Sequence, residues 1–133
     1  MNERVKLDGL VPESLAPKTR KIVLDDFMVP ADIGFHDFEV GSPQRLSVTV
    51  EVWLDAEAFP ETDDAADAWD YDFLRREIAA LVSARRFNLQ ETLARAIYDL
   101  IAARRGVTAL RVATRKPDIY ADCAGVGVEI ASF

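Results

Sequence analysis

The stretch Gln44–Asp55 reads QRLSVTVEVWLD and carries the clearest periodic pattern in the chain. Its apolar residues stand at every second position and are Leu46, Val48, Val50, Val52 and Leu54. Because successive side chains of a strand point to opposite faces, this alternation predicts a strand with one apolar and one mostly polar face. That pattern is typical of an antiparallel sheet that buries one face. The polar face, which carries Trp53, is either solvated or turned toward the inside of an oligomer.

Three further strands flank this stretch. Residues 22–35 are rich in apolar side chains but contain a proline and a glycine, which predict an irregular or bulged strand near a sheet edge. A loop over residues 36–43 joins it to the 44–55 strand as a hairpin. After residue 106, alternation predicts two more strands, at residues 107–116 and 125–130.

Two amphipathic helices are predicted between the strand pairs, one capped by Asp70 and running to about Arg85, the other capped by Asn88 and ended by Gly106. Their stripes are Tyr71, Leu74, Ile78, Leu81 and Val82 in the first and Leu89, Leu93, Ala96, Ile97, Leu100 and Ile101 in the second. Packing both stripes on one face of the sheet buries every apolar face at once. The sequence therefore predicts an α+β domain with a four-stranded antiparallel sheet and two helices on one face.

Composition limits the possible functions. The 133 residues suffice for one domain with a buried core, expected over residues 21–133, and we expect residues 1–20 to form a flexible N-terminal arm. No apolar run approaches the length of a membrane span and no signal segment is recognised, so we expect a cytoplasmic protein. The net charge of −7 argues against nucleic acid as a partner. The single cysteine, Cys123, excludes an intrachain disulfide and a cysteine-based zinc cluster, and the acidic residues of 56–67 do not have the spacing of a calcium loop, so no metal site is predicted.

Glu91 is the main candidate for ligand binding because it falls in the first turn of the second predicted helix. Free backbone N–H groups and the helix dipole stabilise an anion there. A fixed carboxylate suits a flat ligand with two adjacent N–H donors, such as the amino-pyrimidinone edge of a pterin or guanine. However, Asn88 followed three residues later by Glu91 also resembles a capping box. The residues alone leave both interpretations open.

Several motifs occur in an order that resembles the dihydroneopterin aldolases. They are IGFHDFE at 33–39, QRL at 44–46, DY at 70–71, FNLQETLA at 87–94, KP at 116–117 and GVGVEI at 125–130. The resemblance implies the ββααββ tunnelling fold and homo-tetramers or homo-octamers with active sites between subunits. It also implies retro-aldol cleavage of dihydroneopterin to 6-hydroxymethyl-dihydropterin and glycolaldehyde, a reaction of folate biosynthesis. The residues Asp118-Ile119-Tyr120 depart from the family pattern, in which small residues are more usual.

The resemblance implies that Glu91, with Leu89 and Gln90, binds the pterin ring. No cofactor is implied, because the reduced ring supplies its own electron sink, so that neither a metal nor a Schiff-base lysine is needed.

The resemblance also implies three catalytic residues. Lys116 would transfer protons, which requires that partial burial or a cationic neighbour make the amine easier to deprotonate. Tyr71 would act from the neighbouring subunit, and Glu39 would bond the substrate's hydroxyl groups or a water. Without the resemblance, Lys116 reads as an ordinary strand-end lysine, Tyr71 as a core aromatic residue and Glu39 as a solvated loop acid.

Other functions stay open. A 2′-epimerase acting on dihydroneopterin or its triphosphate could use the same cleavage followed by recombination, although the Lys116-Pro117 pair favours the aldolase. A non-catalytic pterin- or purine-binding protein would keep Glu91 and tolerate loss of Lys116 or Tyr71. His36 as a general base and Cys123 as a nucleophile are weaker candidates, because neither has an activating partner in the sequence.

Overall fold

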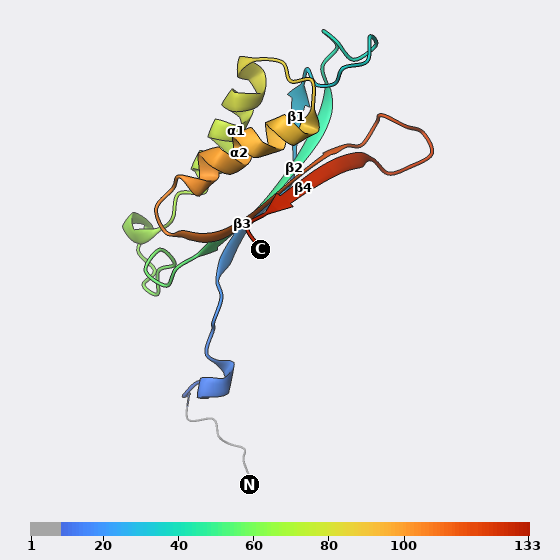
Figure 1. Cartoon of the computed structure of the whole chain (residues 1–133). Coiled ribbons are helices and arrows are strands. Elements are labelled where there is room, and N and C mark those ends of the chain that lie inside the picture. Colours follow the sequence, from blue (N-terminus) through green and yellow to red (C-terminus); the bar gives the residue numbers. More distant parts are fainter. Residues whose placement is uncertain (1–8) are drawn as a thin grey trace.

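The computed structural model describes residues 9–133, and the first eight residues of the expected arm lie outside them. Its main elements are β1 (Lys21–Ala31), β2 (Gln44–Leu54), α1 (Asp72–Ala84), α2 (Gln90–Ala102), β3 (Val107–Lys116) and β4 (Val126–Ala131), with short 3-10 turns at Glu13–Leu15 and Ala65–Asp67. The strands form one antiparallel sheet in the order β1-β2-β3-β4, and both helices lie on the same side of it (Figure 1). The predicted fold class is therefore confirmed.

The edge strand β1 is irregular, as the sequence predicts. Its register against β2 shifts between Leu24 and Phe27, and Asp26 within this bulge has a φ of 55°. The strand ends at Ala31, earlier than the predicted boundary. The chain then turns away, and Ile33 forms an isolated parallel bridge with Phe87, which precedes α2. This bridge joins the end of the first strand to the start of the second helix.

The core lies between the sheet and the helices. Helix α1 packs on β1, and α2 packs on β3 and β4. The largest fully buried side chains include Ile33, Leu46, Leu74, Ile78, Leu93, Ile97, Ile101 and Leu110. Along β3, the buried residues are Leu110, Val112, Thr114 and Lys116, which share the helix-covered face. The apolar row of this strand therefore ends in an amine.

Both predicted helix caps are wrong. Helix α1 begins after Tyr71 and α2 after Leu89, and neither start has a side-chain capping bond. Tyr71 is 59% exposed, so its interpretation as a core aromatic residue is also wrong.

The face of the sheet that the helices leave uncovered is partly shielded from solvent. Ser47 and Glu51 on β2 are buried, and Glu51 accepts hydrogen bonds from Lys21 and Arg111. Residues 9–20 extend from the sheet (Figure 1) and are exposed up to Arg20, whose carbonyl accepts from the N–H of Leu54. In the described part of the chain, no helix has the length and apolar character needed to cross a membrane.

Candidate active site

A buried ion pair joins Lys116 and Glu39. The Lys116 Nζ lies 2.6 Å from Glu39 Oε2, and the two residues are 9% and 3% exposed. Lys116 ends β3 on the helix-covered face, whereas Glu39 comes from the loop between β1 and β2. Taking two charges out of water is costly, so such a pair persists only when its hydrogen bonds are well satisfied. The fold thus brings together two of the three predicted catalytic residues.

Glu39 has further partners that fix its carboxylate. Gln44 Nε2 donates to Oε2 at 3.0 Å and also to the Ile33 carbonyl at 2.8 Å, and the His36 N–H lies 3.4 Å from Oε1. Burial raises the pKa of Glu39, but the hydrogen bonds from Lys116 and Gln44 outweigh this and hold the pKa below its ordinary value. The carboxylate is therefore ionised and held in one orientation.

Lys116 has a different neighbour from the one expected. A proton-transferring lysine was expected to have partial burial or a cationic neighbour, and the structure supplies burial together with the anionic Glu39. The interpretations of Lys116 as an ordinary strand-end lysine and of Glu39 as a solvated loop acid are both wrong.

Gln44 is a site residue that sequence reasoning used only as part of a motif. A signal for it was present, because Gln44 stands at the head of the alternating row that continues with Leu46 and Val48. An amide on the apolar face of a strand needs a buried polar partner. Lys116 stands at the end of the corresponding row in β3, which pairs with β2, so the two strand ends bring their polar groups together.

Gly34 supplies the space for the Glu39 carboxylate. Its φ is +121°, a conformation that residues with a side chain rarely adopt, and a Cβ atom there would lie 2.2 Å from the carboxylate. Only glycine fits both the backbone and the neighbouring acid.

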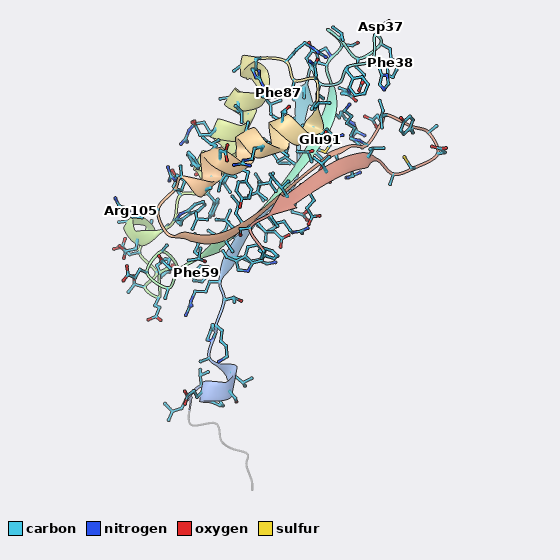
Figure 2. The ribbon with its side chains drawn as sticks, in the orientation of Figure 1. Asp37, Phe38, Phe59, Phe87, Glu91 and Arg105 are labelled. Atoms are coloured by element: carbon cyan, nitrogen blue, oxygen red, sulfur yellow. The ribbon has the colours of Figure 1, made fainter. Side chains whose placement is uncertain are left out.

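Glu91 lies in the first turn of α2 and is exposed. In residues 9–133 its carboxylate has no hydrogen-bond or ion-pair partner. The capping-box interpretation is wrong, because Leu89 precedes the first residue of helix α2 and the Asn88 Oδ1 instead accepts from Arg86 Nη1 at 2.7 Å. Figure 2 shows Glu91 at the end of the domain that carries Asp37 and Phe38, with Phe59 and Arg105 at the opposite end.

Gln90 fixes the start of α2 over the end of the sheet. Its side chain is buried, with Oε1 accepting from Thr114 Oγ1 at 2.8 Å and Nε2 donating to the Val126 carbonyl at 3.1 Å. Thr114 lies two residues before Lys116 on β3, and Val126 of β4 pairs with Lys116. These bonds therefore place Glu91 and Lys116 at the same end of the sheet. The side chain of Gln90 is used within the fold, which leaves its backbone N–H for the predicted substrate contact. Leu89 is 38% exposed beside it.

Tyr71 lies apart from the other candidates in this chain. It borders a cavity of about 260 Å³ with Ile22, Leu24 and Arg75. Through β2, the residues around Leu24 are in register with Val112, and Lys116 lies four residues, about 13 Å, further along β3. One protomer therefore does not bring the Tyr71 hydroxyl to the Lys116 amine.

The loop after Lys116 is tied to β2. Asp118 accepts hydrogen bonds from Arg45 Nε and Nη2, both at 2.8 Å, and the bond from Arg45 lowers the pKa of Asp118. Tyr120 in the same loop is 54% exposed. The departure from the family pattern thus forms an ion pair at the base of the long β3–β4 connection (Figure 1).

The weaker candidates gain no catalytic partner. The His36 ring stacks on Phe38 at 5.3 Å, and Cys123 is exposed in the β3–β4 loop. Within residues 9–133, no group of three or more histidine, cysteine, aspartate or glutamate residues is arranged to hold a metal ion.

The fold and the site together define a class of small ββααββ domains with a lysine–carboxylate pair and a free helix-start acid at one end of the sheet. Residues 22–131 match the family model described as FolB, dihydroneopterin aldolase. This match covers most of the chain, and the chain belongs to the dihydroneopterin aldolase family.

Individual relatives agree with the family match. The dihydroneopterin aldolase of Haemophilus influenzae is 29% identical over 110 residues, which are 83% of this chain and 93% of that protein. A crystal structure of dihydroneopterin aldolase from Burkholderia thailendensis bound to guanine is 34% identical, with a TM-score of 0.74 over 85% of this chain and 89% of that one. The Escherichia coli enzyme in complex with neopterin is 28% identical, with a TM-score of 0.77 over 86% and 99% of the two chains.

Proposed function

We propose that this chain is a dihydroneopterin aldolase, a cytoplasmic aldehyde-lyase of folate biosynthesis. It cleaves dihydroneopterin to 6-hydroxymethyl-dihydropterin and glycolaldehyde. The observation that carries the proposal is the buried Lys116–Glu39 pair at the same end of the sheet as Glu91, which has no partner within residues 9–133, in a chain of this family. Support comes from the solved relatives, whose ligands are guanine and neopterin. Both molecules present an amino group next to a ring N–H.

Substrate binding is assigned to the start of α2. The Glu91 carboxylate accepts two hydrogen bonds from the amino and N–H edge of the pterin, and the helix dipole favours its charge. Leu89 and the backbone N–H of Gln90 line the same ring. The carboxylates of Glu39, Asp32 and Asp118 are already bonded to Lys116, Arg86 and Arg45, so the ring's donor edge selects Glu91.

The reaction is a retro-aldol cleavage assigned to Lys116 and Glu39. The proton of the 2′-hydroxyl leaves to a base, the 2′ carbon becomes the carbonyl of glycolaldehyde, and the C1′–C2′ bond breaks. Its electron pair flows into the ring C=N bond, and protonation at C1′ then gives the hydroxymethyl group. Lys116 transfers the protons, and Glu39 holds the substrate's hydroxyl groups and orients the amine. The ring accepts the electrons itself, so the mechanism requires neither a metal nor a Schiff base.

The complete site needs a second subunit. Tyr71 is exposed, and the β1 residue Leu24 beside it is in register with a position about 13 Å along the sheet from Lys116. We therefore assign to the reaction the partner subunit's Tyr71, in a homo-tetramer or homo-octamer whose sites lie between subunits. Its hydroxyl protonates or orients the intermediate.

The function is tested by incubating the protein with dihydroneopterin and measuring released glycolaldehyde together with the pterin products. Release of both aldolase products supports the proposal. Recovery of the 2′-epimer without glycolaldehyde indicates an epimerase, and tight pterin binding without any product indicates a binding protein. Either of these two results overturns the proposal.

The binding role is tested by Glu91→Gln. Loss of one charged acceptor facing the ring should weaken pterin binding by about 10- to 100-fold, because a hydrogen bond to a charged group contributes about 1.5–3 kcal/mol. Isothermal titration with neopterin measures the change. Glu77→Gln on α1, a partly exposed glutamate whose ion pair is with Arg76, is the matched control and should bind as the wild type does. Unchanged binding by Glu91→Gln would show that the ring is held elsewhere.

A further inference from the structure

Arg86 connects the two segments that carry Glu39 and Glu91. Its guanidinium donates from Nη2 to the Gly34 carbonyl at 2.5 Å, from Nε to Asp32 Oδ1 at 3.1 Å and from Nη1 to Asn88 Oδ1 at 2.7 Å. Gly34 begins the loop that bears Glu39, and Asn88 precedes the helix that bears Glu91. One side chain thus spans both halves of the candidate site.

Asp32 closes the loop from its other side. Its Oδ1 accepts from the N–H of Gly41 at 3.1 Å as well as from Arg86. The loop between Gly34 and Gly41 is therefore held at both ends by groups that meet at the Asp32 carboxylate. Glu39 projects from this loop, and its carboxylate fills the space left by the missing side chain of Gly34.

The backbone bridge beside Arg86 holds only the start of the loop. The N–H of Gly34 donates to the Phe87 carbonyl at 3.0 Å, and the N–H of Phe87 donates to the Asp32 carbonyl at 3.2 Å. These two bonds fix the chain up to Gly34 but do not reach Gly41. Beyond that point, the bond from the Gly41 N–H to Asp32 ties the far end of the loop to the bridge, beside the side-chain bonds of Gln44 to Ile33 and Glu39.

The ion pair is poorly placed to serve stability alone. The side chains of Arg86 and Asp32 are 28% and 31% exposed, and both lie outside the apolar core. Partly exposed ion pairs contribute little to the free energy of unfolding. The planar fork of arginine carries its donors on three separate nitrogens and can meet three acceptors that lie apart, whereas the three donors of lysine share one nitrogen. The arrangement therefore favours geometry over stability.

We propose that Arg86 and Asp32 form a clamp that positions the Glu39 loop against Lys116 and against the start of α2. Both are positioning residues, because neither contacts the Lys116–Glu39 pair directly. The inference rests on the proposed function, since the effect of the clamp is exerted through Glu39 and Glu91. Without the clamp, the backbone that bears Glu39 loses this anchor, and its carboxylate is held by the bonds from Lys116, Gln44 and the His36 N–H.

Four substitutions test the clamp in glycolaldehyde release. Arg86→Gln, Arg86→Lys and Asp32→Ala should lower kcat/KM by about 10- to 100-fold, since a misplacement of about 1 Å can have an effect of that size. Asp32→Asn keeps the oxygen that accepts from Gly41 and Arg86, and should stay within about threefold of the wild type. The control is Arg76→Gln, an exposed arginine on α1 that pairs with Glu77, and it should be unchanged. Equal losses in Asp32→Asn and Asp32→Ala overturn the geometric role.

A double-mutant cycle with Glu39 separates positioning from a general effect on folding. If Arg86 acts through Glu39, the loss of kcat caused by Arg86→Gln should largely disappear in a Glu39→Gln background. Additive losses in the two variants overturn the proposal.

Amide hydrogen exchange keeps this test distinct from the test of the aldolase activity. Exchange at residues 36–42 should rise in Arg86→Gln but not in Arg76→Gln. Faster exchange in a protein that releases no glycolaldehyde would retain the clamp and reject the aldolase. Unchanged exchange would reject the clamp, whatever the activity.

Discussion

Two buried carboxylates in this domain hold cations in contrasting ways. Glu51 lies on the open face and belongs to a network with one residue from each strand, namely Lys21 of β1, Glu51 of β2, Arg111 of β3 and Glu129 of β4. Glu39 lies at the end of the sheet toward the helices, with Lys116 and Gln44 as its side-chain partners. Arginine stays protonated under all ordinary conditions, whereas a lysine amine can exchange its proton. The Glu51 network, which contains an arginine and a half-exposed lysine, is therefore suited to holding strands together, and the Glu39 pair, whose cation is a buried lysine, is suited to chemistry.

The largest expected contrast comes from truncating the lysine of each cluster. Lys116→Ala should reduce glycolaldehyde release by about 10²- to 10⁴-fold, because proton transfer by a positioned group contributes a factor of that order. Lys21→Ala removes the equivalent amine from Glu51 and should leave turnover within about twofold. Steady-state kinetics with dihydroneopterin measures both. Comparable losses in the two variants would remove the functional distinction between the clusters.

Neutralising either carboxylate should lower the free energy of unfolding, and the more buried Glu39–Lys116 pair should show the larger loss. Glu51→Gln leaves Lys21 and Arg111 facing each other without an anion, and should lower the free energy of unfolding by about 1–2 kcal/mol. Glu39→Gln leaves the buried Lys116 amine without its anion, so it should lower the free energy of unfolding by more, about 3–5 kcal/mol, and should lower turnover as well. Urea unfolding near neutral pH measures the stability of each variant. A Glu51→Gln protein as stable as the wild type would show that the network does not hold the strands.

The smallest effect is expected in the pH dependence of stability. Burial raises the pKa of Glu39, yet its bonds from Lys116 and Gln44 lower the pKa overall, and hydrogen bonds from Lys21 and Arg111 lower that of Glu51. A carboxyl group with a lowered pKa binds its proton more readily in the unfolded chain. Its contribution to stability is therefore complete above the ordinary value of 4.5 and is lost as the pH falls through the lower folded value.

Urea unfolding measured from about pH 6 down to about pH 3 checks this linkage. The wild type should lose stability on acidification, and Glu51→Gln should lose less over the same interval because one of the contributing groups is absent. Lys21→Ala should also flatten the pH dependence of stability, since it removes the hydrogen bond that contributes most to the lowered pKa of Glu51. A variant that follows the wild-type curve would show that Glu51 titrates alike in both states.

The fold could be predicted because its signals are local. Alternation placed β2, β3 and β4 within a few residues of their observed bounds, and the bulge in β1 followed from an irregular apolar stretch. The helix caps could not be predicted, since Asn88 is engaged by the fork of Arg86, which reaches it only together with Asp32 and Gly34. A local sequence pattern gives no information about an arginine that is held in place by residues far away in the sequence.

The candidate site was predictable only in part. Motifs singled out Lys116, Glu39 and Glu91, and the first two form a pair across a separation of 77 residues. Sequence reasoning missed the contact of Gln44 with Glu39 and the engagement of the Gln90 side chain by Thr114. Both contacts depend on which strand ends become neighbours, and this is decided by the register of the whole sheet.

Gly34 shows that an absent side chain can matter as much as a reactive one. It offers no functional group, yet its missing Cβ provides the space in which the Glu39 carboxylate lies. In saturation mutagenesis of this chain, every replacement at position 34, alanine included, should score as a loss of function. Such a profile would usually be attributed to a catalytic side chain. Here its origin is the space of about one methyl group that Gly34 leaves to the Glu39 carboxylate.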